Sequence, residues 1–380
     1  MLAITNAMLI FPEYMMENGT VLIKNGKILD YGYTGKISIP DGCRVIDAGG
    51  KYLGPGLIDI HTHAGGDYWF YEEPLKAARA HLMHGTTSLL PTVYFNATRE
   101  QLLEQIEHIK ENSKKEEGRI IRGLYMEAPY LNPKFGADRE NNPWKKPVDP
   151  KDYMELIEAA GDFAKVWCLA PERENIETFV KDVKTAIPDI VFSVAHSEAS
   201  PYEIERLMPY GLKLATHHTN ATGDLQKYPE CRGVSVDETV NYNDEIYAEL
   251  ICDRRGIHVD PYMLRLVLKI KGKNKIILIS DACVFDGPVP EGYEGVTDIN
   301  FDHQGEIAGS KLTLDVACYN MMLHTGSSLC DVFKFASTNP AKLLGFNTKG
   351  RIEKGFDADL ILVDDKMSVN LVILQGEIIQ

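Results

Sequence analysis

The stretch GLIDIHTHAGGD, residues 56–67, joins a short apolar run to two histidines and two glycines. Alternate side chains of a β-strand point to the same face, so His61 and His63 share one face at the end of this run. Two imidazoles on one face suit a divalent cation. The motif alone also fits one packed and one solvated histidine, so the choice depends on the rest of the chain.

Beyond this stretch, short apolar runs alternate with helix-like segments. Helical patterns occur, for example, at residues 74–84, 98–115 and 260–271. Continuous apolar strands alternating with helices indicate an α/β protein with a parallel sheet, and eight such units fit a (β/α)8 TIM barrel. An open doubly wound sheet is the alternative, but no Gly-x-Gly-x-x-Gly motif follows the first strand. We expect the eight strands at residues 56–61, 86–92, 119–126, 165–170, 190–195, 212–216, 256–260 and 275–280.

Both ends of the chain have the pattern of short antiparallel strands. Asn25-Gly26 between two apolar runs is a strong hairpin signal, and similar strands follow near residues 350–380. We therefore predict a small β-sandwich domain formed from both termini, at residues 1–51 and 349–380. The hydrolase barrel is expected between them, at residues 52–348.

Composition excludes some classes of partner. The 380 residues are 44% hydrophobic, which is ordinary for a globular protein. With 40 basic and 55 acidic residues the net charge is −15, so we expect a small-molecule substrate and no nucleic-acid partner.

The cysteines predict a reducing environment. Their number is odd, and no Cys-x-x-Cys spacing suggests a zinc ribbon or a disulfide framework. We expect no signal peptide, no membrane-spanning segment and a cytoplasmic location. The seven cysteines are Cys43, Cys168, Cys231, Cys252, Cys283, Cys318 and Cys330.

Ionisable residues recur where the expected strands end. In a barrel the carboxyl ends of the strands carry the chemistry, so these side chains should meet at one face. Independent core histidines would not fall so regularly, and the joint pattern predicts a metal site. The residues are His61, His63, Glu127, His196, His217, His258 and Asp281. The other histidines, which fall elsewhere, are expected to be ordinary core or surface residues.

These residue types suit hydrolytic metal chemistry. Imidazoles and a carboxylate bind zinc or a similar metal, with iron and manganese as alternatives. A bound ion lowers the pKa of its water from about 15.7 to about 7. Asp281, alone on the last strand, is the candidate catalytic acid–base. Glu127 could bridge two ions, so one or two ions are expected.

The motifs together resemble the amidohydrolase superfamily and, within it, the N-acetylglucosamine-6-phosphate deacetylase family. The resemblance runs along nearly the whole chain. In order, it rests on PGLIDIHTHAG, GTTSLLPT, MEAPYLNPKFGA, CLAPE, AHSEA, THHTNA, SDA, IAGSKLTLDVA, STNPAKLLG and GRIEKGFDADLILVD.

The resemblance implies deacetylation of an N-acetylamino sugar phosphate. Water activated by the metal would attack the acetamide carbonyl, and Asp281 would move the proton to the leaving amine. Asn220 and the backbone at Ala221 match a phosphate-contacting stretch, and His258 matches a substrate-binding histidine. A homodimer is implied, in which the partner helps to bind phosphate. The implied ligands are Glu127, His196 and His217 for the main metal, and His61 and His63 for a second.

Three positions differ from the family pattern. The family's Gly-Ala-His ends here in Asp138, and an ionised aspartate cannot donate the hydrogen bond of that histidine. The family's phosphate arginine is displaced by a few residues to Arg232, and Ala128 replaces a glycine. We keep Asp138 and Arg232 as candidate substrate-binding residues.

Two alternatives remain at this stage. One is another amidohydrolase reaction, such as hydrolysis of an N-acyl amino acid or a cyclic amide. The other is a catalytically inactive barrel that serves as a scaffold, although such proteins typically lose ligands that are retained here.

Overall fold

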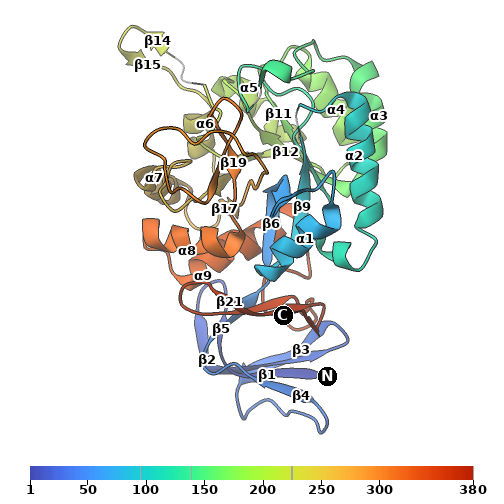
Figure 1. The fold of residues 1–380 in the computed structure, drawn as a ribbon, viewed down its shortest axis with the longest axis vertical. Coiled ribbons are helices and arrows are strands. Elements are labelled where there is room, and N and C mark those ends of the chain that lie inside the picture. Colours follow the sequence, from blue (N-terminus) through green and yellow to red (C-terminus); the bar gives the residue numbers. More distant parts are fainter. Residues whose placement is uncertain (95, 138, 224–225, 380) are drawn as a thin grey trace.

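The computed structural model describes residues 1–94, 96–137, 139–223 and 226–379. Figure 1 shows two parts along the long axis of the molecule: a barrel surrounded by helices, and a sheet that carries both ends of the chain. This arrangement confirms the predicted TIM barrel with a small β domain built from the two termini. The exact residue boundaries between the parts stay a prediction.

Parallel strands form the barrel, and each pairs with the next one along the chain. The first and last strands meet where the Asp281 N–H donates to the His61 carbonyl oxygen at 2.9 Å. Most strand residues are buried, because helices cover the outside of the barrel and side chains fill its interior. The strands are β6 (Leu57–Thr62), β9 (Thr86–Val93), β10 (Leu124–Met126), β11 (Ala164–Leu169), β12 (Val191–Val194), β13 (Leu212–Ala215), β16 (Tyr247–Ile251) and β17 (Ile276–Ile279).

Helices connect these strands and cover the barrel (Figure 1). In α2 the buried residues Leu102, Ile106 and Ile109 have the spacing of one helix face. Thr98 caps this helix by accepting the Gln101 N–H at 3.3 Å. The covering helices are α1 (Pro74–Met83), α2 (Arg99–Asn112), α3 (Pro150–Ala160), α4 (Ile176–Ala186), α5 (Pro201–Glu205), α6 (Val236–Tyr242), α7 (Pro261–Lys271), α8 (Leu314–Thr325), α9 (Leu329–Phe333) and α10 (Asn339–Leu344).

The two termini share one mixed sheet with its own apolar core. The C-terminal strand β20 lies antiparallel to the N-terminal strand β5, with Leu362 opposite Leu53. The sheet order is β22-β21-β20-β5-β1-β2-β3, and β4 pairs with β1. The strands are β1 (Leu2–Ile10), β2 (Met15–Lys24), β3 (Lys27–Tyr33), β4 (Arg44–Asp47), β5 (Tyr52–Pro55), β20 (Leu360–Val363), β21 (Val369–Leu374) and β22 (Glu377–Ile378).

Short strand pairs extend from the barrel at the end that carries the site. In Figure 1 the β14–β15 hairpin projects away from the barrel, whereas β19 lies over its upper end. The pairs are β7 (Ala64–Gly65) with β8 (Tyr68–Trp69), β14 (Gln226–Tyr228) with β15 (Cys231–Arg232), and β18 (Ile299–Phe301) with β19 (Ile307–Ser310).

The seventh strand differs from the prediction at residues 256–260, which was wrong. The strand is β16, and His258 lies in the loop that leads to α7. There the Asp253 carboxylate accepts the His258 N–H at 2.8 Å, which holds this segment in a turn. The true strand was overlooked because Glu249 places a charge inside its apolar run.

The third strand is shorter than predicted. Of residues 119–126 only the last three form β10, because Glu117–Ile120 is a 3-10 helix. A Cβ at Gly123 would lie 2.5 Å from the Lys165 side chain, so the chain passes close to the neighbouring strand here.

Among the described residues, no helix is both long and apolar enough to cross a membrane. All seven cysteines are free.

Candidate active site

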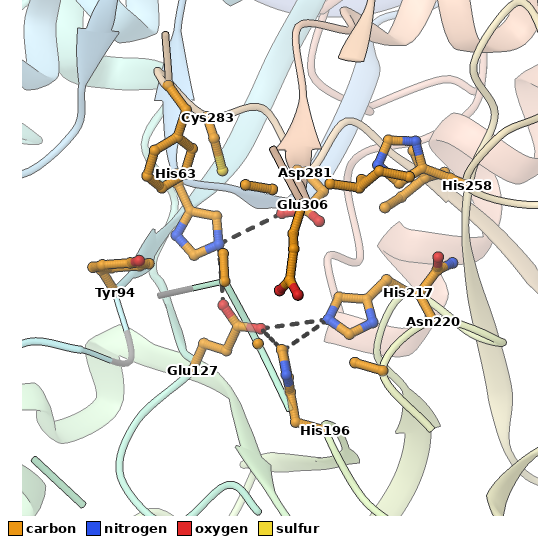
Figure 2. A pocket seen from close by; sticks show the side chains of 18 of the residues that line it. His63, Tyr94, Glu127, His196, His217, Asn220, His258, Asp281, Cys283 and Glu306 are labelled. Atoms are coloured by element: carbon orange, nitrogen blue, oxygen red, sulfur yellow. Dashed lines mark hydrogen bonds and ion pairs between the residues drawn. The ribbon is translucent and has the colours of Figure 1, made fainter. Parts of the chain in front are cut away.

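The residues predicted at the strand ends converge at the carboxyl-terminal end of the barrel. Figure 2 shows the side chains of His63, Glu127, His196, His217 and Asp281 around one pocket. Glu127 directly follows β10, while Asp281 stands two residues after β17. We call these buried residues the strand-end group: His61, His63, Glu127, His196, His217 and Asp281.

Glu127 lies between two sets of histidines. Its Oε1 is 3.0 Å from His196 Nε2 and 3.5 Å from His217 Nε2. Its Oε2 is 3.0 Å from His63 Nε2 and 3.8 Å from His61 Nε2. The two oxygens of one carboxylate therefore face different ring nitrogens, as in a carboxylate that bridges two ions.

The donor atoms fit divalent cations. His196 Nε2 and His217 Nε2 lie 3.1 Å apart and both face Glu127, so three donor atoms surround one point. The ligand atoms of these three residues lie within 4.8 Å of one another. A second set with the same property consists of His61, His63 and Asp281. Imidazole nitrogens and carboxylate oxygens are the donors that zinc prefers.

The electrostatics of the strand-end group favour a bound cation. Burial alone raises the pKa of Glu127, but hydrogen bonds from the facing histidines hold that pKa well below its usual range. Burial lowers the pKa of His61, but the carboxylates of Asp281, Glu127 and Glu249 outweigh it and raise that pKa well above its usual value. The carboxylates around His61 therefore create a negative potential at this point, which favours a cation.

Three members of the strand-end group have left-handed backbones. The φ angles are 43° at His196, 29° at His217 and 46° at Asp281, and each residue lies two positions past the end of its strand. This region is unfavourable for residues with a side chain. Neighbouring strands hold the conformation: the His218 N–H, for example, donates to the Glu249 carbonyl oxygen at 2.7 Å. Such strain is typical of functional sites.

Glu249 supports the strand-end group from behind, and the sequence analysis missed it. Its Oε2 lies 3.1 Å from His61 Nδ1 and accepts the His217 backbone N–H at 3.2 Å. With the Nδ1 proton held by Glu249, His61 Nε2 is left to face the site. The signal was available, because a glutamate in the apolar run YAELI needs a buried partner.

A cavity of about 230 Å³ opens over the strand-end group. Tyr94 and Phe285 form part of its wall, and His258, Asn220 and Ala221 line it together with the metal-facing residues (Figure 2). The structure thus brings three of the predicted substrate-binding residues to the site.

His258 and Asn220 present polar atoms that the protein leaves unused. His258 Nε2 and Asn220 Nδ2 are buried and have no hydrogen-bond partner among the described residues. His258 Nδ1 lies 3.4 Å from the Asp253 carboxylate. Burial raises the pKa of Asp253, but hydrogen bonds from His258 and backbone N–H groups lower it to about 2, so the partner is ionised. With its proton on Nδ1, His258 offers Nε2 as an acceptor.

The two remaining predicted residues are not in this cavity. Asp138 lies outside the described residues. Arg232 is on the β14–β15 hairpin, where its side chain is 72% exposed and pairs with Glu238 at 2.5 Å. Within this single chain, Arg232 does not line the cavity.

The sequence of this chain is similar to that of proteins from a known family. The sequence model of the amidohydrolase family matches residues 52–379. The N-acetylglucosamine-6-phosphate deacetylase of Bacillus subtilis (strain 168) is 29% identical over 394 residues, which cover 99% of this chain and 96% of that protein. These matches confirm the resemblance found in the motifs.

Solved structures show the same fold. The N-acetylglucosamine-6-phosphate deacetylase from Pasteurella multocida is 25% identical with a TM-score of 0.85, covering 99% of both chains. A mutant of the enzyme from Mycobacterium smegmatis, solved in complex with N-acetyl-D-glucosamine-6-phosphate, is 23% identical with a TM-score of 0.83, covering 99% of this chain and 98% of that one.

Proposed function

This chain belongs to the amidohydrolase family, and on that premise we propose that it removes the acetyl group of N-acetylglucosamine-6-phosphate. The products are acetate and the amino sugar phosphate. The observation that carries the proposal is the complete strand-end group beside a cavity of about 230 Å³. Similarity to deacetylases over nearly the whole chain supports the choice of substrate.

The metal is held by the strand-end group in this proposal. Glu127, His196 and His217 would hold one divalent ion, and His61 and His63 would hold a second. The convergence of their ring nitrogens on Glu127 supports this assignment. Zinc is the ion we propose, and iron and manganese accept the same donors. When bound, such an ion lowers the pKa of water and polarises a carbonyl oxygen.

Asp281 moves the proton. Its Oδ1 lies 3.5 Å from Nε2 of both His61 and His63, so the carboxylate lies beside the proposed metal ligands, where the attacking water and the acetamide would meet. The carboxylate accepts a proton from the water as the carbonyl is attacked. It then donates that proton to the sugar nitrogen as the carbon–nitrogen bond breaks.

His258 and Asn220 orient the sugar in the cavity. His258 Nε2 accepts a hydrogen bond from a substrate hydroxyl, and Asn220 Nδ2 donates one to a substrate oxygen. Both atoms are buried without a partner among the described residues, which supports this role. The backbone of Ala221 borders the same part of the cavity.

Acetate release by the metal-loaded protein tests the function. The substrates are N-acetylglucosamine-6-phosphate, its galactosamine epimer and the two unphosphorylated sugars. We expect turnover of the glucosamine 6-phosphate and its loss in Asp281→Asn. Release of acetate from N-acyl amino acids, with none from any acetamido sugar, would contradict the proposal.

We also propose that the enzyme is a cytoplasmic homodimer. Free cysteines are typical of a reducing compartment, which supports the location. Tyr228 and Tyr242 are 72% and 82% exposed, and exposed aromatic side chains are common at interfaces between subunits. Sedimentation of the purified protein, which gives its mass in solution, checks the oligomeric state.

A further inference from the structure

Arg139 is the one arginine or lysine among the described residues that line the active-site cavity. The acidic residues that line the same cavity are Glu127, Asp281 and Glu306. Among the described residues of this chain, Arg139 is therefore the one permanent cation that a phosphate ester would meet in this cavity. Arg232, the arginine that the sequence predicted for this task, is exposed on its hairpin and outside the cavity.

Arg139 is paired with Glu306 at the cavity. Its Nη2 donates to Glu306 Oε1 at 3.0 Å, and its Nη1 donates to Glu306 Oε2. The two residues are 167 positions apart in the sequence. Arg139 begins a short 3-10 helix (Arg139–Asn141) in the connection between β10 and α3. Glu306 stands just before β19 in the β18–β19 hairpin. Figure 2 shows the Glu306 side chain extending into the pocket that holds the strand-end group.

The pairing has the geometry of oxyanion recognition. Two parallel N–H bonds from one guanidinium fit a carboxylate and a phosphate in the same way. The side chains of Arg139 and Glu306 are 39% and 45% exposed, so the pair is in contact with solvent. Partly exposed ion pairs contribute little stability, so a second anion can replace the carboxylate at small cost.

We propose that Arg139 binds the anionic group of the substrate, which takes the place of the Glu306 carboxylate. This assignment rests on the proposed function, in which that group is the sugar phosphate. Glu306 is then a competitor that closes the mouth of the cavity when no substrate is present.

Kinetics of matched variants test this assignment. Arg139→Gln should raise KM for N-acetylglucosamine-6-phosphate and lower kcat/KM by roughly 10- to 100-fold, because a charge-assisted bidentate contact is lost. The loss should be much smaller for the unphosphorylated sugar, which has no phosphate for Arg139 to bind. Glu306→Gln should lower KM for the phosphorylated substrate and strengthen competitive inhibition by inorganic phosphate.

An arginine elsewhere provides the control. Arg351 is paired with Glu353 at 2.5 Å, and the two side chains are 48% and 45% exposed, close to the values of the Arg139 pair. Arg351 lies outside the cavity. Arg351→Gln removes the same charge in a similar environment, and we expect it to leave both substrates and the inhibition by phosphate unaffected.

The possible outcomes separate the two proposals. If the wild type hydrolyses the 6-phosphate and Arg139→Gln keeps the same preference for it, the role of Arg139 is wrong and the function stands. An equal loss of kcat on both sugars would also overturn it, because that pattern indicates a structural role. If the wild type hydrolyses only N-acyl amino acids, the phosphate assignment fails with the function. Titration of each variant with inorganic phosphate, monitored by calorimetry, gives a readout that does not depend on turnover.

Discussion

The strand-end group and the surroundings of Lys349 are two buried polar clusters that are satisfied in different ways. Lys349 is 6% exposed and donates to Asp359, and its Nζ also lies 3.3 Å from Asp357. Asp359 in turn accepts the Gln375 backbone N–H at 2.7 Å. This cluster, which ties the end of the barrel sequence to the terminal sheet, contains its own counter-charges.

The polar atoms of the strand-end group do not all satisfy one another in this way. Its ring nitrogens face one another and the two oxygens of Glu127, and His61 Nε2 has no hydrogen-bond partner among the described residues. A buried cluster that satisfies itself contributes to the fold, whereas one whose donors converge on a common point requires a ligand. The comparison predicts that substitutions in the two clusters affect different properties.

The largest effect is expected at Asp281. Asp281→Asn keeps the shape of the side chain but removes the proton acceptor, so kcat should fall by about 10²- to 10⁴-fold. The melting temperature of the metal-loaded protein should change little, because the amide keeps the size of the side chain and the ion would hold His61 and His63 in place. Acetate release and thermal unfolding of the same preparation measure both quantities. A variant that loses stability and activity together would remove the distinction between the two clusters.

The opposite result is expected at Lys349. Lys349→Met leaves the buried carboxylate of Asp359 without its counter-charge, which should lower the free energy of unfolding by about 3–5 kcal/mol. The kcat of the folded fraction should stay close to that of the wild type. Urea unfolding measures the change, and Arg351→Gln at an exposed pair serves as the control, with about 0.5 kcal/mol or less expected.

His81 is a buried histidine that belongs to neither cluster. Its Nε2 donates to the Ala64 carbonyl oxygen at 2.8 Å, and burial lowers its pKa to about 4. The unfolded chain takes up this proton near pH 6.5, and the folded chain only near pH 4. Folding is therefore weakened as the pH falls from 6.5 toward 4, on the order of 3 kcal/mol from this residue.

The variant His81→Gln isolates that contribution. Its amide can still donate to Ala64, but it does not titrate. Subtracting its free energy of unfolding from that of the wild type at each pH, with the same metal content, should give a difference that changes across this window. A difference that stays constant between pH 4 and 6.5 would show that the folded His81 titrates normally.

A smaller effect is expected at Glu249. Glu249→Gln keeps an acceptor oxygen near His61 Nδ1 but removes the negative charge, so metal affinity should fall by roughly 10- to 100-fold. Competition with a chelator, followed by metal analysis, measures the affinity. Unchanged affinity would mean that Glu249 stabilises the fold rather than orienting the ligand.

The sequence was sufficient for the parts of the molecule that follow strand periodicity. Apolar strands that end in His61, Glu127 or Asp281 predict both the barrel and the position of its site, because the carboxyl ends of parallel strands meet at one face. The strand around Glu249 was overlooked for the reverse reason, since a charge inside an apolar run breaks the pattern although the fold provides its partner.

Contacts between distant loops could not be predicted in this way. Arg139 and Glu306 meet across 167 residues, and no periodicity connects two loops whose separation depends on the whole barrel. The position of Arg232 on a projecting hairpin could not be predicted either, because its neighbours depend on the direction in which the hairpin leaves the barrel. Motif spacing predicted Arg232 as a substrate-binding residue, which stays a prediction, and it did not point to Arg139, which lines the cavity of this chain.

Metal content is the measurement that tests the central claim most directly. Wild-type protein purified from zinc-supplemented medium and its Glu127→Ala variant would be analysed for metal per folded chain. We predict about one or two divalent ions in the wild type and a clear loss in the variant, because Glu127 faces both sets of histidines. Folded wild-type protein that releases acetate without bound metal would contradict the account.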